Sequence, residues 1–197
     1  MRIVLAFSGG LDTSFCVAYL TRERHAEVIT VTVNTGGIDA AGLADVAEQA
    51  YAVGAAEHHE VDARGAVYER FVATLIRGNV LRGGVYPVSV AAERTQQALE
   101  VARVVRETAA DAVAHGSTGA GNDQVRFDVA FRALLPGVEI ITPIRDLGLA
   151  RTQAVEYLAS RGLPATLAFE CPIGYCGPQE TGKCPIGDRT VFGRCDR

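Results

Sequence analysis

The chain has 197 residues, of which 48% are hydrophobic and 21% are charged, a composition typical of a folded globular domain rather than a disordered or fibrous chain. A chain of this length buries roughly 70% of the surface that its unfolded form exposes, so its core needs no disulfide or metal for support. Its 19 lysines and arginines against 23 aspartates and glutamates give a net charge of -4, which excludes a general basic field that attracts nucleic acid or anionic lipid.

The chain begins with a short apolar segment. The run of residues 3–7 is too short for a signal peptide or a membrane span, so we expect a cytoplasmic protein without membrane partners. Residues 2–7 and the β-branched residues 27–34 each end at a glycine pair, which predicts two buried parallel strands. Between them, residues 12–24 carry apolar side chains at helical spacing and predict a helix.

The same alternation of strands and helices continues along the chain. Further strands are expected over residues 58–62, 112–115 and 139–143, and further helices over residues 41–53, 66–76, 90–108, 125–134 and 151–160. This order predicts an α/β fold with a doubly wound parallel sheet that helices cover on both faces. Ligands of such sheets bind beyond the carboxyl ends of the strands.

The character of the sequence changes after about residue 164. Residues 165–197 hold four of the five cysteines and three of the seven prolines, and they show no clear helical or strand period. The sequence therefore predicts one α/β domain over residues 1–164, followed by a small cysteine-rich appendix over residues 165–197.

A polar, glycine-containing loop joins the first predicted strand to the first predicted helix. It consists of Ser8, Gly9, Gly10, Leu11, Asp12, Thr13 and Ser14. Backbone N–H groups converge at a helix N-terminus and, with the helix dipole, favour an anion there. The loop thus predicts a phosphate site, in which Asp12 can hold Mg²⁺. The alternative is a tight turn in which Asp12 only caps the helix.

A second polar turn, residues 115–127, also leads from a strand into a helix. Arg126 offers a planar fork for a carboxylate, Asn122 offers an amide donor and acceptor, and Asp123 can hold an ammonium group. Together they predict an amino-acid pocket. The alternative is an ordinary helix start, in which Asn122 or Asp123 caps the helix and Arg126 is solvated.

Both motifs carry a family resemblance. The first matches the Ser-Gly-Gly-x-Asp-Thr/Ser-Ser loop of the N-type ATP pyrophosphatases, and the two together resemble argininosuccinate synthase over about residues 3–163. Residues 34–37, 78–82 and 86–94 match as well. The resemblance implies an adenine nucleotide alpha hydrolase-like fold (the PP-loop fold) and the use of ATP and Mg²⁺. It also implies a reaction in which the ureido oxygen of citrulline attacks the α-phosphate, pyrophosphate leaves, and the aspartate amine displaces AMP.

The resemblance also implies roles for individual residues. ATP contacts are implied for Ala6, Phe7, Ser8, Gly9, Gly10, Leu11, Asp12, Thr13, Ser14, Thr35 and Gly116. Aspartate contacts are implied for Thr118, Asn122 and Asp123, and citrulline contacts for Tyr86, Asn122 and Arg126. Ser8, Asp12 and Arg126 are the implied catalytic residues. Arg145 is a further candidate, because other enzymes with this loop have substrate-facing residues after the corresponding strand.

The tail cysteines leave the chemistry open. Cys171, Cys176, Cys184 and Cys195 are spaced C-x4-C, C-x7-C and C-x10-C, and they can bind Zn²⁺ or an iron–sulfur cluster, carry sulfur, or be inert thiols. Argininosuccinate synthases have instead a longer domain that completes the citrulline pocket and builds a tetramer. The tail is similar to those of 7-cyano-7-deazaguanine synthases and some tRNA thiolases.

Three functions therefore compete. The first is an AMP-forming C–N ligase, the second a sulfur-transfer or nitrile-forming enzyme, and the third a nucleotide sensor. A homo-oligomer, with a dimer favoured, is the expected assembly.

Overall fold

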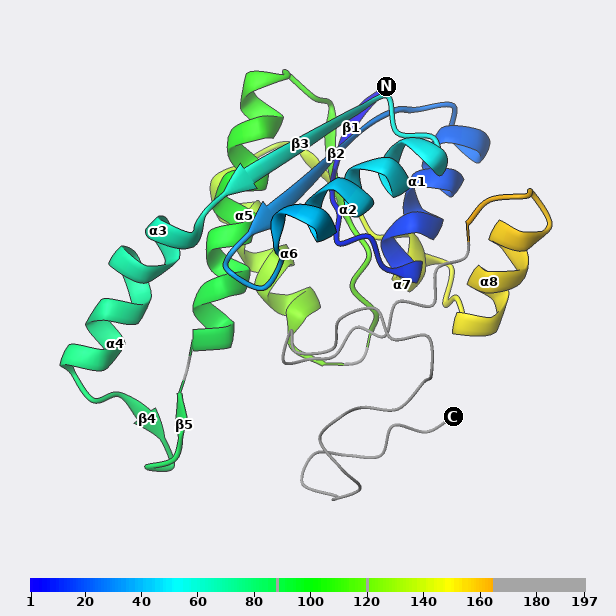
Figure 1. Cartoon of the computed structure of the whole chain (residues 1–197). Coiled ribbons are helices and arrows are strands. Elements are labelled where there is room, and N and C mark those ends of the chain that lie inside the picture. The colour runs from blue at the N-terminus through cyan, green and yellow to red at the C-terminus, as the bar shows by residue number, and fades with distance from the viewer. Residues whose placement is uncertain (88, 120, 165–197) are drawn as a thin grey trace, which may run out of the picture.

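The fold is built around a five-stranded parallel sheet (Figure 1). The computed structural model describes residues 1–87, 89–119 and 121–164. The strands, in spatial order, are β3 (Glu57–Asp62), β2 (Glu27–Asn34), β1 (Arg2–Ala6), β6 (Ala112–His115) and β7 (Glu139–Ile141). All neighbours pair in parallel. The chain moves outward from β1 to β3 and then returns to the other side of β1, so the strand order reverses between β1 and β6.

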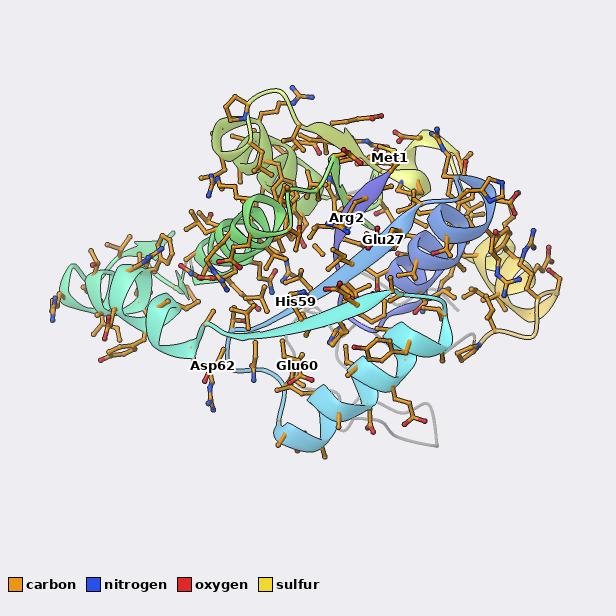
Figure 2. The ribbon with its side chains drawn as sticks, turned by 90° about the horizontal axis from the view of Figure 1, so that it is seen from above. Met1, Arg2, Glu27, His59, Glu60 and Asp62 are labelled. Carbon is orange, nitrogen blue, oxygen red and sulfur yellow. The ribbon has the colours of Figure 1, made fainter. Side chains whose placement is uncertain are left out.

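Helices cover both faces of this sheet, which confirms the predicted doubly wound fold. One face packs against α1 (Leu11–Glu23), α2 (Ala40–Ala52) and α8 (Arg151–Ala159), and the other against α5 (Ser89–Glu107) and α6 (Asp123–Leu134). The view from above shows these layers, with β3 as the edge strand, marked by His59, Glu60 and Asp62 (Figure 2).

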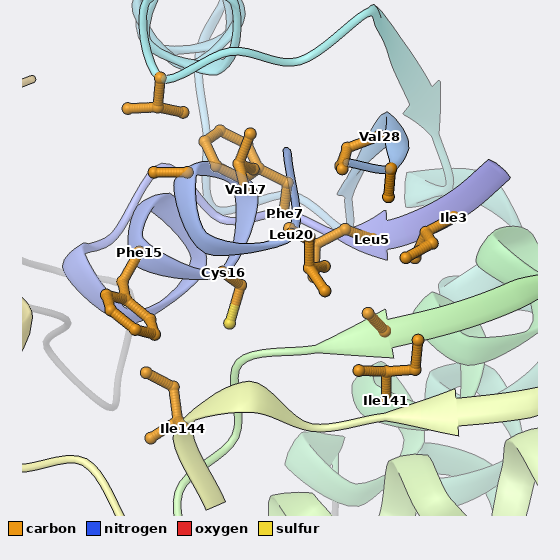
Figure 3. Packing of buried hydrophobic residues seen from close by; sticks show 14 of the residues in the cluster. Ile3, Leu5, Phe7, Phe15, Cys16, Val17, Leu20, Val28, Ile141 and Ile144 are labelled. Atoms are coloured by element: carbon orange, nitrogen blue, oxygen red, sulfur yellow. The ribbon is translucent and has the colours of Figure 1, made fainter. Parts of the chain in front are cut away.

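Each central strand supplies side chains to two separate cores. In β1, Ile3 and Leu5 pack into the core with α1, α2 and α8, whereas Val4 packs into the core with α5 and α6. This follows from the period of two along a strand, and it explains why the strand is apolar at consecutive positions. Figure 3 shows the first core, in which Cys16 of α1 points toward β6 and β7 and Phe15 lies near Ile144 of α7.

The segment of residues 64–87, which we call the arm, differs most from the prediction. The helix expected over residues 66–76 is a continuous helical run of α3 (Arg64–Val67), the π-helical turn η1 (Tyr68–Val72) and α4 (Ala73–Arg77). After it comes a two-stranded antiparallel sheet, β4 (Leu81–Arg82) and β5 (Tyr86–Pro87), which the sequence pattern did not predict. Strands of two residues are too short to show a period. The arm extends outward beyond the end of β3 (Figure 1).

The last predicted strand is too long at its carboxyl end. It was expected over residues 139–143, but β7 ends at Ile141, and Pro143 begins the short helix α7 (Pro143–Asp146). Proline has no N–H for a strand ladder, and its fixed φ angle suits the first position of a helix. Within the described part of the chain, no helix combines the length and apolar character that a membrane span requires. The predicted cysteine-rich appendix lies outside the described residues.

Candidate active site

The first polar loop lies at the carboxyl end of the central strand β1, where α1 begins. The N-cap of α1 is Gly10, which is in an extended conformation and has no side chain, so Asp12, in the first turn, is not the N-cap residue. Gly9 has a φ of 75°, and a Cβ there would lie 2.9 Å from Cγ2 of Val46 in α2. Backbone and glycine therefore form the helix start, and the N–H groups of the first turn lack intrahelical acceptors, as an anion site requires.

The hydroxyl groups of this loop point to different surroundings. Oγ1 of Thr13 donates to the carbonyl oxygen of Gly10 at 3.1 Å and lies 3.3 Å from Oγ of Ser8. Ser14 is completely buried, and its Oγ accepts a hydrogen bond from Nε2 of Gln49 at 2.8 Å. Ser8 is exposed at the loop surface. The structure thus brings Ser8 and Thr13 together and directs the Ser14 hydroxyl toward α2.

The second polar turn packs directly on the start of α1. A Cβ added to Gly116 would lie 3.0 Å from Cγ2 of Thr13, 3.2 Å from its backbone nitrogen and 3.3 Å from the carbonyl carbon of Asp12. The two motifs, more than 100 positions apart in the chain, are therefore in contact where the strand order reverses between β1 and β6. This is the position at which sheets of this type bind ligands.

An ion-pair cluster lies at the start of α6. Oδ1 of Asp123 accepts a hydrogen bond from Nη1 of Arg126 at 2.6 Å, and its Oδ2 accepts one from Nε of Arg94 in α5 at 3.2 Å. Partial burial alone raises the pKa of Asp123, but Arg94 and Arg126 outweigh this effect and hold its pKa below the usual value. Asn122 is the N-cap of α6 but makes no side-chain cap bond. Asn122 thus occupies the cap position that the alternative expected, but Arg126 is paired with Asp123 and not simply solvated.

The cluster continues to the end of β2. Oγ1 of Thr35 donates to Oε1 of Glu93 at 2.7 Å, and Oε1 of Glu93 lies 3.7 Å from Nη1 of Arg94. The sequence placed Glu93 and Arg94 in a family-like segment but predicted no role for either. In the sequence they are two adjacent residues of opposite charge near the start of a predicted helix. Sequence alone cannot distinguish this pattern from a solvent-exposed helix face. Thr118 is exposed in the turn before α6, and Tyr86 lies in β5 of the arm.

A buried polar group lies behind the second turn. His115 is 1% exposed, and its Nε2 lies 2.8 Å from Oδ1 of Asp128. Oδ2 of Asp128 accepts a hydrogen bond from Nη1 of Arg145 at 2.8 Å. Burial lowers the pKa of His115 and outweighs the opposing effect of Asp128. Arg145, a candidate for substrate contact, is thus paired with Asp128, and its side chain remains 32% exposed.

The donor set fits a magnesium nucleotide better than a resident metal. Among the described residues, no group of three or more His, Cys, Asp or Glu side chains could hold a metal ion. Asp12, in the first turn of α1, is the carboxylate of the first polar loop, so Mg²⁺ there would depend on oxygens of a bound phosphate for its other ligands. The four tail cysteines predicted as metal ligands lie outside the described residues.

The family model and the curated relatives agree on one family. Residues 2–164 match the family model described as "Arginosuccinate synthase N-terminal HUP domain". Among curated relatives, the argininosuccinate synthase of Pyrobaculum aerophilum is 46% identical over 163 residues, which are 83% of this chain and 41% of the relative. That of Pyrococcus furiosus is 40% identical over 166 residues, 84% of this chain and 40% of the relative. The chain spans about two fifths of the length of these relatives.

A solved structure supports the fold alone. It is described as a predicted subunit of tRNA methyltransferase from Methanocaldococcus jannaschii, and it aligns with a TM-score of 0.51 at 19% identity. The alignment covers 81% of this chain and 76% of that one. At this identity the likeness extends to the arrangement of helices and strands and not to the reaction.

Proposed function

The chain belongs to the argininosuccinate synthase family, and we propose that it is an ATP-dependent, AMP-forming C–N ligase that joins citrulline to aspartate. One observation carries the proposal, namely the packing of Gly116 on the phosphate loop at the point where the strand order reverses. This packing joins the turn that leads into α6, where Asp123 and Arg126 lie, to the start of α1, and so supports neighbouring sites for an amino acid and a nucleotide. A reaction between a nucleotide and an amino acid needs this adjacency.

In the proposed complex, the phosphates of ATP lie at the start of α1. The first-turn N–H groups of the helix, with the hydroxyls of Ser8 and Thr13, orient the phosphate chain. Asp12 would help to hold Mg²⁺, and the ion would supply positive charge that offsets the charge of the phosphates. Thr35 and Gly116 would border the nucleotide, in line with the family resemblance. The family supports the use of ATP, whereas the individual contacts are part of our proposal.

The amino-acid substrates would bind at the ion pair of Asp123 and Arg126. These two groups have the charges that a zwitterionic amino acid needs, since a carboxylate can bind the Arg126 fork and an ammonium can bind Asp123. The remaining contacts would come from Thr118, Asn122 and Tyr86. The ureido oxygen of citrulline would then attack the α-phosphate, and the aspartate amine would displace AMP, so no protein nucleophile is needed.

The remaining sequence predictions belong to the same proposal. They are the domain boundary after residue 164, the cytoplasmic location, the homo-oligomer, and a Zn²⁺ or iron–sulfur site at Cys171, Cys176, Cys184 and Cys195. The sulfur-transfer alternative depends on these cysteines, and no described residue favours it.

The test is release of AMP and pyrophosphate from Mg-ATP by the full chain, with citrulline alone, with citrulline and aspartate, and with neither. We expect AMP only when both amino acids are present. Asp12→Ala and Ser8→Ala should weaken Mg-ATP binding, whereas the control Glu139→Ala should not, because Glu139 begins the edge strand β7 at the amino ends of the strands, away from the loop. AMP formation that needs a sulfide donor instead would favour the sulfur-transfer alternative, and ATP binding without AMP under any condition would favour a sensor.

A further inference from the structure

We propose that His115 is a positioning residue, whose Nδ1 atom holds the backbone turn of Gly116 and Ser117 against the phosphate loop. The inference rests on the proposed binding of ATP at that loop. His115 would thus contribute to ATP affinity through the hydrogen bond at its Nδ1 atom, in addition to its packing in the core.

The contacts of the imidazole determine its protonation. The backbone N–H of Ser117 donates to Nδ1 at 3.3 Å, and a backbone N–H can only donate, so Nδ1 carries no proton. The proton of the neutral ring is then on Nε2, which donates to Oδ1 of Asp128 at 2.8 Å. The two ring nitrogens therefore have opposite roles, one toward the turn and one toward α6.

The surroundings of the ring fix its orientation. Asp128 is held by Arg145 of α7 at 2.8 Å, and the same guanidinium lies 3.3 Å from Oε1 of Gln124. The imidazole stacks on Phe127, with ring centroids 5.4 Å apart and an interplanar angle of 23°. Since the ring is 1% exposed and held on two sides, it cannot turn without breaking the contact with Asp128 or Ser117.

The turn that His115 holds is the one that meets the nucleotide loop. Gly116 follows His115 directly and lies against Thr13 and Asp12. Ser117, the next residue, is attached through its N–H to the histidine ring. The position of the turn relative to the start of α1 is therefore determined by an anchor in α6 and α7, transmitted through His115. We expect loss of the Nδ1 contact to loosen this turn and weaken ATP binding.

Two substitutions test the hydrogen bonds of the two ring nitrogens separately. His115→Asn places an amide oxygen near the position of Nδ1, so it can accept from Ser117 but cannot reach Asp128. His115→Gln places an amide nitrogen near the position of Nε2, so it can donate to Asp128 but leaves Ser117 without its acceptor. Both remove the aromatic ring, and asparagine leaves the larger cavity, so a role in packing alone would weaken ATP binding by His115→Asn at least as much as by His115→Gln.

The measurement is the dissociation constant of Mg-ATP for the full chain by isothermal titration calorimetry. We expect His115→Gln to bind about two- to tenfold more weakly than His115→Asn, as the loss of one hydrogen bond predicts. Equal affinities of the two variants, or a weaker His115→Asn, would overturn the inference. If the wild-type chain itself binds no ATP, the proposed function fails and the inference fails with it, a result distinct from equal variants on an ATP-binding chain.

A second measurement is independent of activity and of the folding of variants. In ¹⁵N-labelled wild-type protein, nitrogen chemical shifts report which ring nitrogen carries the proton in each of the four histidines. His115 should be in the Nε2–H form. The charged groups that act on the ring are Asp128 from α6, in direct contact with it, and Arg145 and Asp146 from α7. A Nδ1–H form at neutral pH would overturn the proposal.

Discussion

The contact between the two polar motifs can be tested by adding one methyl group, in Gly116→Ala. The new Cβ would lie 3.0 Å from Cγ2 of Thr13, 3.2 Å from its backbone nitrogen and 3.3 Å from the carbonyl carbon of Asp12. Two of these three atoms are backbone, and the Thr13 side chain is held by its hydrogen bond to Gly10. The neighbours therefore cannot rotate away, and the start of α1 has to move from the end of β6.

The magnitude follows from the cost of overpacking, which is about 1–3 kcal/mol of unfolding free energy. For a protein of this size, that cost lowers the melting temperature by about 2–12 °C. The same displacement moves the first-turn N–H groups, so we expect the dissociation constant of Mg-ATP to rise about tenfold, or about 1.4 kcal/mol. Calorimetric unfolding and isothermal titration measure the two effects.

The matched control is Gly65→Ala in α3, where a Cβ would meet no atom within 4 Å. This variant should keep wild-type ATP affinity and be as stable as the wild type, or more stable by up to about 1 kcal/mol. If Gly116→Ala melts at the wild-type temperature and binds Mg-ATP with wild-type affinity, the close approach of β6 to the phosphate loop does not position the nucleotide, and the reasoning is wrong.

Three further predictions concern stability, pH and substrate selectivity. Phe131→Ala, at a side chain with no exposed surface, should lower the unfolding free energy by about 3–5 kcal/mol in urea titration, whereas Val129→Ala, 62% exposed on the same helix, should change it by less than about 0.5 kcal/mol. The hydrogen bonds of Asp128 with Arg145 and His115 outweigh the effect of its burial and lower its pKa. The carboxylate therefore stabilises the fold above the unfolded pKa of 3.8, and this stabilisation is lost as the pH falls through the lower folded pKa. Asp128→Asn should lower the unfolding free energy at neutral pH, and the unfolding free energy of this variant should fall less than that of the wild type below pH 3.8. Arg126→Lys should raise the KM of the amino-acid substrates more than that of ATP, because lysine cannot form the bidentate fork, and an equal rise in both would contradict the carboxylate role.

Much of the architecture could be predicted from local sequence pattern. The apolar runs at residues 2–7 and 27–34 and the helical spacing between them suffice for a parallel sheet with helices, because burial on both faces requires continuous apolar strands. The glycine loop between them has the composition of an anion-binding helix start. Local pattern failed at Pro143, where a helix replaces the end of a strand, and in the arm, where strands of two residues carry no period.

The side-chain pairings between different elements depend on the tertiary structure. The sequence suggests separate ligand roles for Arg126 and Asp123, but in the structure Asp123 pairs with both Arg126 and Arg94. Arg94 comes from α5, which begins 34 positions before α6. Likewise, the partners of His115 come from α6, α7 and its own turn. Such pairings depend on distances between elements, which a single sequence does not contain.

The sequence by itself therefore determined the class of fold and the family, because hydrophobic period and a contiguous loop motif are local properties of the chain. Only the tertiary structure decided that the phosphate loop and the second turn touch, through Gly116 and Thr13, and that a buried histidine connects this contact to α6 and α7. The physical reason is the strand order. Insertion of β6 beside β1 brings together residues about 100 positions apart, and close packing then limits which side chains can occupy the contact.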